Sequence, residues 1–229
     1  MLKLIKLEWK KNNVGKYVRN ALITVAVLVP FILAMAGELE GAQTVESYGS
    51  GMINASIDLF ANMCFMVFTG AMLSAFIVGA YENRTMGLMF SYPIRRWKIL
   101  VSKMLAVWIF NFAAVIVCKL VLYGAVVLTK SYTHVTADSI RLTDPFFYVQ
   151  MLVGSAVMVS VSFLALPVGL MARSSKAAVI ASVVVVCFTQ GQIGQYTLVN
   201  NIGFHALLLA LWAVAVFLTL RGVETRDVM

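Results

Sequence analysis

Six apolar runs, each followed by a polar segment, set the pattern of this sequence. Five of the runs hold seventeen residues or more, and a helix needs roughly 17–25 apolar residues to cross a bilayer. The pattern therefore predicts an all-α integral membrane protein with six transmembrane helices, organised as a single transmembrane domain over residues 1–229. The predicted spans are residues 21–37, 57–81, 104–128, 145–172, 177–188 and 202–220.

Two of these runs contain a proline. Pro30 lies inside the first run and Pro167 inside the fourth. Proline removes a backbone donor and clashes with the carbonyl four residues earlier, so we expect a kink at Pro30 and an interruption at Pro167.

The fifth run is too short to span. Its twelve residues would cover about 18 Å as a helix, against a hydrocarbon core about 30 Å thick. The sequence TQGQIGQYTLVNN (189–201) follows. Either the helix continues through this segment, or the chain breaks at Gly191 or Gly194 and re-enters the membrane in contact with protein or water. We predict a short helix and a bend that form an outer gate, whose amides avoid lipid: Gln190, Gln192 and Gln195.

Residues 1–20 are polar and basic. At helical spacing Lys6 and Lys10 share one face, while Ile5 and Trp9 share the neighbouring one. This pattern predicts an interfacial helix at the N-terminus, with its lysines towards lipid phosphates. A plain basic flank is the alternative.

The most polar internal segment is YENRTMGLMFSYPIRRWKILVSK (81–103), between the second and third runs. It is longer than a simple connection and suits a helix of two to three turns. Tyr92 precedes Pro93, and a residue before proline is pushed out of the helical region, so the helix should stop near Ser91. Trp97 then marks the return to the membrane.

Composition and charge support this interpretation. The chain is 61% hydrophobic and 12% charged, with a net charge of +8 and a mean hydropathy of +0.90, whereas soluble domains are about 45–50% apolar and about 25% charged. The cations gather at the ends of apolar runs, as in membrane proteins, and not on one face that would bind nucleic acid. The cysteines lie inside apolar runs and are interpreted as small hydrophobes, not as metal ligands or disulfides: Cys64, Cys118 and Cys187.

The distribution of lysine and arginine predicts the orientation. Six spans put both termini on one side of the membrane. With the N-terminus inside, fifteen of the 18 lysines and arginines lie in cytoplasmic segments, and only Lys130 and Arg141 lie in outer loops. The remaining one, Lys119, lies within the third span. This asymmetry predicts a multi-pass topology with both termini cytoplasmic.

The loop now placed in the cytoplasm has a recognisable order of residues. Glu82 is followed by Arg84-Thr85, then by Ser91-Tyr92-Pro93, a basic pair, and Lys103 inside the next helix. This order resembles the signature loop of ABC-2 type permeases, the membrane subunits of bacterial ABC exporters. Arg84 stands where that family usually has glycine. The small size and basic N-terminal helix are similar to permeases of lantibiotic self-protection and peptide-toxin export.

The resemblance implies a mechanism and a set of partners. Segment 82–97 would be the coupling helix that docks into a groove on a separate ABC ATPase, which would bind ATP and Mg²⁺. Two ATPase subunits and a second permease copy would complete the assembly in the bacterial plasma membrane. The chain contains no G-x-x-x-x-G-K-[ST] motif of its own. The residues predicted to take part in ATPase coupling are Glu82, Arg84, Thr85, Leu88, Phe90, Tyr92, Pro93, Arg95 and Arg96.

Residue chemistry leads to the same function for the loop. Its charged residues suit charge-assisted bonds to a protein partner, and its methionine and aromatic residues suit an apolar contact. A helix that lies on the membrane with its arginines on lipid phosphate is the alternative.

The spans carry amides and hydroxyls but little charge, which suits amphipathic peptides, such as antimicrobial peptides, better than small ions. The candidate substrate path consists of Asn62, Thr69, Gln190, Gln192 and Gln195. An ion-coupled secondary carrier is an alternative, but it calls for acidic residues at mid-membrane and an internal repeat, and neither is present. An ABC-2 exporter of lipid, drug or glycan is another. No hydrolase or metalloprotease motif is present, so the chain is not expected to be an enzyme.

Two further features concern packing. Lys119 lies in the third span, where it either reaches the outer interface or forms a structural pair, with a substrate role as the alternative. Asp58 begins the second span and is expected at the outer interface. A small-residue ridge on the second span would let another helix approach closely, and a shorter one lies on the fifth span. The ridge positions are Ala71, Ala75 and Gly79, then Ala177 and Ala181.

Overall fold

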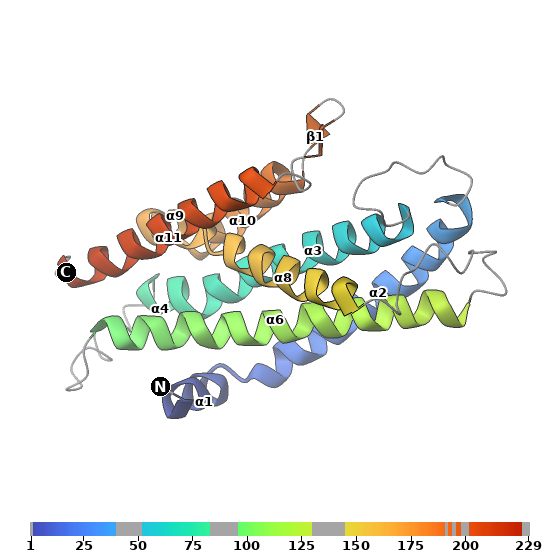
Figure 1. Cartoon of the computed structure of the whole chain (residues 1–229). Coiled ribbons are helices and arrows are strands. Elements are labelled where there is room, and N and C mark those ends of the chain that lie inside the picture. Colours follow the sequence, from blue (N-terminus) through green and yellow to red (C-terminus); the bar gives the residue numbers. More distant parts are fainter. Residues whose placement is uncertain are drawn as a thin grey trace. The chain divides into compact units, whose positions relative to one another are not determined.

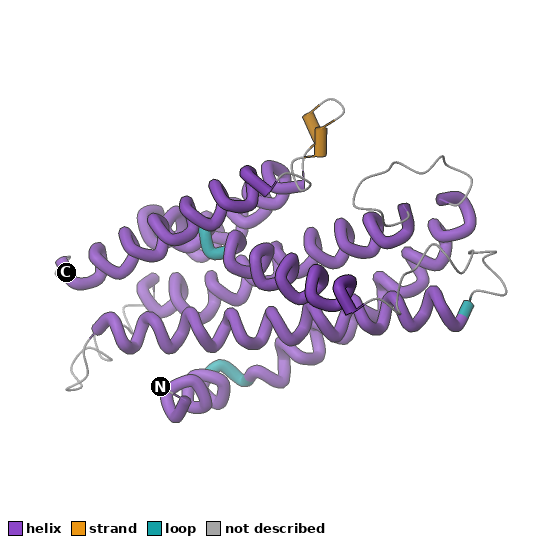
Figure 2. The backbone as a smooth tube through the Cα atoms, viewed as in Figure 1, coloured by secondary structure: helices purple, strands orange, loops and turns teal. Residues whose placement is uncertain are grey.

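The computed structural model describes residues 2–39, 52–82, 96–129, 145–190, 192–193, 196–197 and 202–225. Helices dominate this part of the chain, and two short strands form a hairpin (Figures 1 and 2). The elements are α1 (Leu2–Lys11), α2 (Val14–Leu39), α3 (Met52–Leu73), the π-helix η1 (Ser74–Val78), α4 (Gly79–Glu82), α6 (Arg96–Leu128), α8 (Pro145–Ser162), α9 (Ala165–Ala172), α10 (Ser175–Gln190), β1 (Gln192–Ile193), β2 (Tyr196–Thr197) and α11 (Ile202–Thr225).

Within the described part of the chain, four helical segments are long and apolar enough to cross a membrane. Two shorter apolar helical segments, Ser175–Gln190 and Ala206–Phe217, follow them. The protein is therefore a helical protein of membrane type. The four long segments are Val14–Met35, Ile53–Glu82, Trp97–Leu128 and Pro145–Ala172.

The chain divides into two compact units, and several helices contribute to both. One unit comprises Met1–Val14, Phe65–Asn111 and Val157–Met229. The other comprises Gly15–Cys64 and Phe112–Ala156. We call them the first and second units.

The sequence predicted one helix over residues 1–20, but the structure has a break within this region. α1 ends at Lys11, and α2 begins at Val14 instead of near residue 21. Asn13 has a left-handed φ of 48°, a conformation that asparagine tolerates better than most residues. The side chain of Asn12 donates back to the carbonyl of Glu8 at 3.1 Å, so local side-chain bonding ends the helix. α2 then continues through Pro30.

The fourth predicted span is interrupted before its proline, not at it. α8 ends at Ser162 and α9 begins at Ala165, so Pro167 lies in the first turn of α9, where a missing backbone donor costs little. The ring of Pro167 would meet the carbonyl of Phe163, four residues earlier. That carbonyl instead accepts from the backbone N–H of Leu166 at 3.0 Å, in a tighter turn.

Two glycines allow close helix contacts in the first unit. A Cβ on Gly169 of α9 would lie 2.5 Å from the Cβ of Ala178 on α10. A Cβ on Gly70 of α3 would overlap the side chain of Ser182 on α10. These contacts bring α3, α9 and α10 together.

The small-residue ridge predicted on the second span has a different place. Ala71 and Ala75 are exposed. Gly79 lies near Ser175 of α10, and Gly70, outside the predicted ridge, makes the closer contact with that helix. On α10, Ala181 of the shorter ridge is buried. The sequence correctly indicated that small residues on this span allow close helix contact, but it did not indicate which face of α3 meets a neighbouring helix.

α10 ends at Gln190 and does not continue through the glutamine-rich segment. β1 pairs antiparallel with β2, with Gln192 opposite Thr197 and Ile193 opposite Tyr196. The predicted short helix in this segment is therefore wrong. Glycines at positions 191 and 194 disfavour helix, and the isoleucine, tyrosine and threonine near them favour strand pairing.

Candidate functional site

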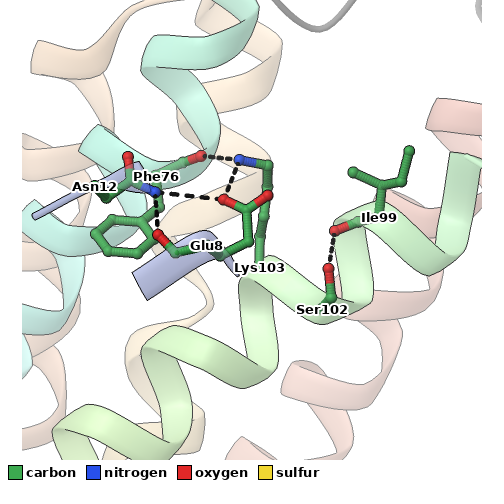
Figure 3. Close-up of polar contacts among 6 residues, drawn as sticks. All are labelled: Glu8, Asn12, Phe76, Ile99, Ser102 and Lys103. Atoms are coloured by element: carbon green, nitrogen blue, oxygen red, sulfur yellow. Dashed lines mark hydrogen bonds and ion pairs between the residues drawn. The ribbon is translucent and has the colours of Figure 1, made fainter. Parts of the chain in front are cut away.

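A buried lysine connects three elements of the first unit. Lys103 of α6 is 1% exposed, and its Nζ lies 3.0 Å from Oε2 of Glu8 on α1. The same ammonium donates to the backbone carbonyl of Phe76 in η1 at 3.0 Å (Figure 3). We call Glu8, Phe76 and Lys103 the Lys103 cluster. Because a charge in an apolar interior is costly unless it is paired, this contact ties α1 and η1 to α6.

The π-helix explains why the Phe76 carbonyl can accept a hydrogen bond from Lys103. The backbone N–H of Gly79 bonds to the carbonyl of Ser74, five residues earlier, which widens the turn. Such bulges disturb the regular ladder of backbone bonds and are frequent at functional sites. The carbonyl of Phe76, inside this widened turn, accepts from Lys103.

α1 makes a second contact with α6. The indole Nε1 of Trp9 donates to the carbonyl of Ala106 at 3.2 Å, and Ile5 is 6% exposed. Lys6 and Lys10 are exposed on the neighbouring face of α1, and so is Leu7. The helix therefore packs against the protein through Ile5 and Trp9.

A second cluster lies where α4 ends. Both the backbone N–H and the hydroxyl of Ser175 donate to Oε2 of Glu82, at 3.1 and 2.6 Å. The hydroxyl of Ser74 donates to the carbonyl of Ser175 at 2.9 Å. We call Ser74, Glu82 and Ser175 the Ser175 cluster. Since Ser175 begins α10, the carboxylate of Glu82 binds an N-terminal N–H of that helix and complements its dipole.

Both clusters connect helices of the first unit. Together they attach the helical segment formed by α3, η1 and α4 to α1, α6 and α10. The attachment points lie near the C-terminal end of that segment. Among the described residues, no group of three or more histidine, cysteine or acidic side chains could hold a metal ion.

The structure places only part of the predicted coupling segment. Glu82 is the last residue of α4, and its bonds go to Ser175 of the same chain. Arg96 is the first residue of α6, which begins eight residues before the predicted span at 104. Outside the described residues lie Arg84, Thr85, Leu88, Phe90, Tyr92, Pro93 and Arg95.

The predicted substrate-path residues are distributed over both units. Thr69 is fully buried and donates to the carbonyl of Phe65 at 2.7 Å. Gln190, at the end of α10, lies 3.8 Å from Sδ of Met158. Asn62 is 6% exposed. Gln192 lies in β1, and Gln195 lies outside the described residues.

The sequence analysis did not identify the partners in either cluster. Glu8 is the only acidic side chain in the first twenty residues, and a lysine inside an apolar helix needs a counter-charge, so the sequence indicates this pairing. The sequence indicates the role of Ser175 more weakly, because serine favours helix N-termini and this one follows a basic turn. Nothing in the sequence indicates the role of the Phe76 carbonyl, because a π-helix has no clear sequence pattern.

Comparison with known proteins gives one distant relative. The chain is 22% identical over 231 residues to the uncharacterized protein YcbO of Bacillus subtilis (strain 168), and the match covers 99% of this chain and 100% of YcbO. No family model matches the chain. No solved structure matches it.

Proposed function

We propose that this chain is the permease subunit of an ATP-driven exporter of the ABC-2 type in the bacterial plasma membrane. In this proposal it has six spans and both termini in the cytoplasm. Two copies pair with two copies of a separate ATPase subunit, which binds ATP and Mg²⁺. The complex moves amphipathic or hydrophobic substrates, preferably peptides, out of the cell.

The attachment of both ends of segment 82–97 supports this proposal. The helix that leads into the segment is held at Ser175, and the helix that leaves it is held at Glu8 and Phe76. A coupling element transmits force only if its ends are held firmly. Movement of an ATPase bound to this segment would reach α1, α6 and α10 through short polar bonds.

The length of α10 is compatible with six spans. Its 16 residues extend about 24 Å, somewhat less than a hydrocarbon core of about 30 Å. The β1–β2 hairpin directly after it would cover the remaining depth. α11 has 24 residues and would extend about 36 Å, which is ample.

Two substitutions test the coupling role. Arg95→Ala should reduce co-purification of the ATPase, because it removes a charge from the proposed docking surface. Glu82→Ala should leave docking intact and abolish substrate-stimulated ATP hydrolysis, because it releases α10. Glu82→Gln, which keeps an oxygen acceptor for Ser175, should retain most of the stimulation.

Arg141→Ala, in a predicted outer loop, is the matched control and should behave as wild type. The readouts are ATPase recovered with the tagged permease from solubilised membranes and hydrolysis in proteoliposomes. Wild-type docking and hydrolysis in both Arg95→Ala and Glu82→Ala would show that segment 82–97 is not the coupling element.

A further inference from the structure

A second buried lysine forms an ion pair in the second unit. Nζ of Lys119 on α6 is 2.8 Å from Oδ1 of Asp58 on α3. The side chain of Lys119 is only 2% exposed, whereas that of Asp58 is 46% exposed. Lys119 therefore forms the structural pair that was one of the expectations. The second carboxylate oxygen of Asp58 stays accessible.

The two buried lysines differ in how well they are paired. An ammonium group has three donors. Lys103 uses two of them on oxygens of Glu8 and Phe76. Within the described part of the chain, Lys119 has Asp58 as its one partner, and the contact lacks the angles of a directional hydrogen bond. Lys119 thus keeps at least two donors for another group.

Further unpaired polar atoms lie one helical turn from this pair. Tyr123 follows Lys119 on α6, and Asn62 follows Asp58 on α3, each by four residues, so each shares a face with a member of the pair. Tyr123 is 2% exposed and Asn62 is 6% exposed. α3 and α6 run antiparallel, since Lys103 contacts Phe76 whereas Asn111 contacts Met72, so Tyr123 and Asn62 lie on opposite sides of the pair. Neither the Tyr123 hydroxyl nor Oδ1 of Asn62 has a hydrogen-bond partner among the described residues.

We propose that Asp58, Lys119 and Tyr123 form a binding subsite for the peptide bond of an amphipathic substrate. Lys119 would donate to the peptide carbonyl. The accessible oxygen of Asp58 would accept from the peptide N–H, and the Tyr123 hydroxyl can do either. Naming a peptide as the cargo rests on the exporter function proposed above.

Charge balance favours an uncharged ligand group over an ammonium or a phosphate. The carboxylate of Asp58 neutralises the ammonium of Lys119, so the subsite has no net charge. A ligand with a net charge would bury that charge in an apolar region, which is costly. A peptide bond has one acceptor, which suits the free donors of Lys119, and one donor, which suits the accessible oxygen of Asp58.

Binding to the permease in lipid nanodiscs tests the subsite without any ATPase. The probe is tritiated N-dodecanoyl-Ala-Ala amide, which has no charge. Its control is the same molecule with the central N–H replaced by an ester oxygen. We expect saturable binding of the amide, with the ester about tenfold weaker, since a hydrogen bond to a charged group is worth about that factor.

Tyr123→Phe is the deciding variant. Its hydroxyl makes no hydrogen bond within the described structure, so the fold does not depend on it. It should weaken binding of the amide about fivefold, on the order of one neutral hydrogen bond, while Lys119→Met should weaken it about tenfold. Tyr148→Phe, on the more exposed Tyr148 of α8, should bind as wild type. Thermal unfolding monitors the folding of each variant.

The subsite is wrong if Tyr123→Phe binds the amide as wild type does, or if amide and ester bind equally. It is also wrong if the free-acid form of the probe binds more tightly than the amide, or if no probe binds saturably because water fills these positions. If the wild type binds the amide probe but does not dock an ATPase, the exporter function is contradicted and the subsite is not.

Discussion

Two lysines of one helix, α6, illustrate how a buried charge is accommodated at the level of single residues. Lys103 has a carboxylate and a backbone carbonyl as partners, from two different elements. Among the described residues, Lys119 has a carboxylate alone as its partner. The better-paired lysine is suited to hold helices together, and the less-paired one is suited to receive another group.

The Lys103 cluster predicts the effect of removing one charge. Glu8→Gln should destabilise the protein by about 3 kcal/mol, because it leaves a buried ammonium without a counter-charge. The double variant Glu8→Gln with Lys103→Met should recover most of this loss, because no charge stays buried. Thermal unfolding in detergent, followed by tryptophan fluorescence, measures both. Equal unfolding temperatures for wild type and Glu8→Gln would mean that the ion pair does not hold α1.

At the level of elements, close backbone contacts decide how the helices of the first unit pack. Gly70 meets Ser182, and Gly169 meets Ala178. Neither glycine has a backbone φ that requires glycine, so the reason for these residues is space. The interior is as dense as an organic crystal, and one extra methyl group has to displace a neighbour.

Gly70→Ala should therefore lower stability by about 1–3 kcal/mol, because its methyl group would overlap Ser182. Gly154→Ala on α8 is the matched control. Nothing lies within 4 Å of a Cβ at that position, so alanine should be neutral or gain up to about 1 kcal/mol from its helix propensity. Unfolding temperatures of the two variants in the same detergent provide the comparison. A Gly70→Ala protein as stable as Gly154→Ala would contradict the close contact with α10.

For the molecule as a whole, the asymmetry of positive charge predicts the orientation. Fifteen lysines and arginines on one side against two on the other are hard to reconcile with the reverse topology. The four long apolar helical segments of the described chain agree with a membrane protein, and the side on which each end lies stays a prediction.

Cysteine labelling tests it in a variant without the three native cysteines. An impermeant thiol reagent added to intact cells should modify Thr136→Cys but not Ser91→Cys. Both should react after the cells are opened, which controls for accessibility. Labelling of Ser91→Cys from outside would reverse the predicted orientation.

The amino-acid order was enough to predict the long apolar helices of this protein, since long apolar runs need to satisfy their backbone within one helix in lipid. It also located the short fifth helix, whose apolar run at 177–188 lies within α10. The prediction from sequence was wrong where local hydrogen bonding competes with helix formation. The turn at Asn12 and Asn13 and the strands after Gln190 depend on short-range bonds that apolar periodicity does not report.

Only the folded chain paired the polar side chains. Glu8 and Lys103 are 95 residues apart in sequence, and Glu82 and Ser175 are 93 apart. A charge in an apolar run signals that it needs a partner, but many partners satisfy that need equally well in sequence. Which one is chosen depends on how the helices pack, and here that packing depends on a π-helix and on two glycines whose effect exists only in three dimensions.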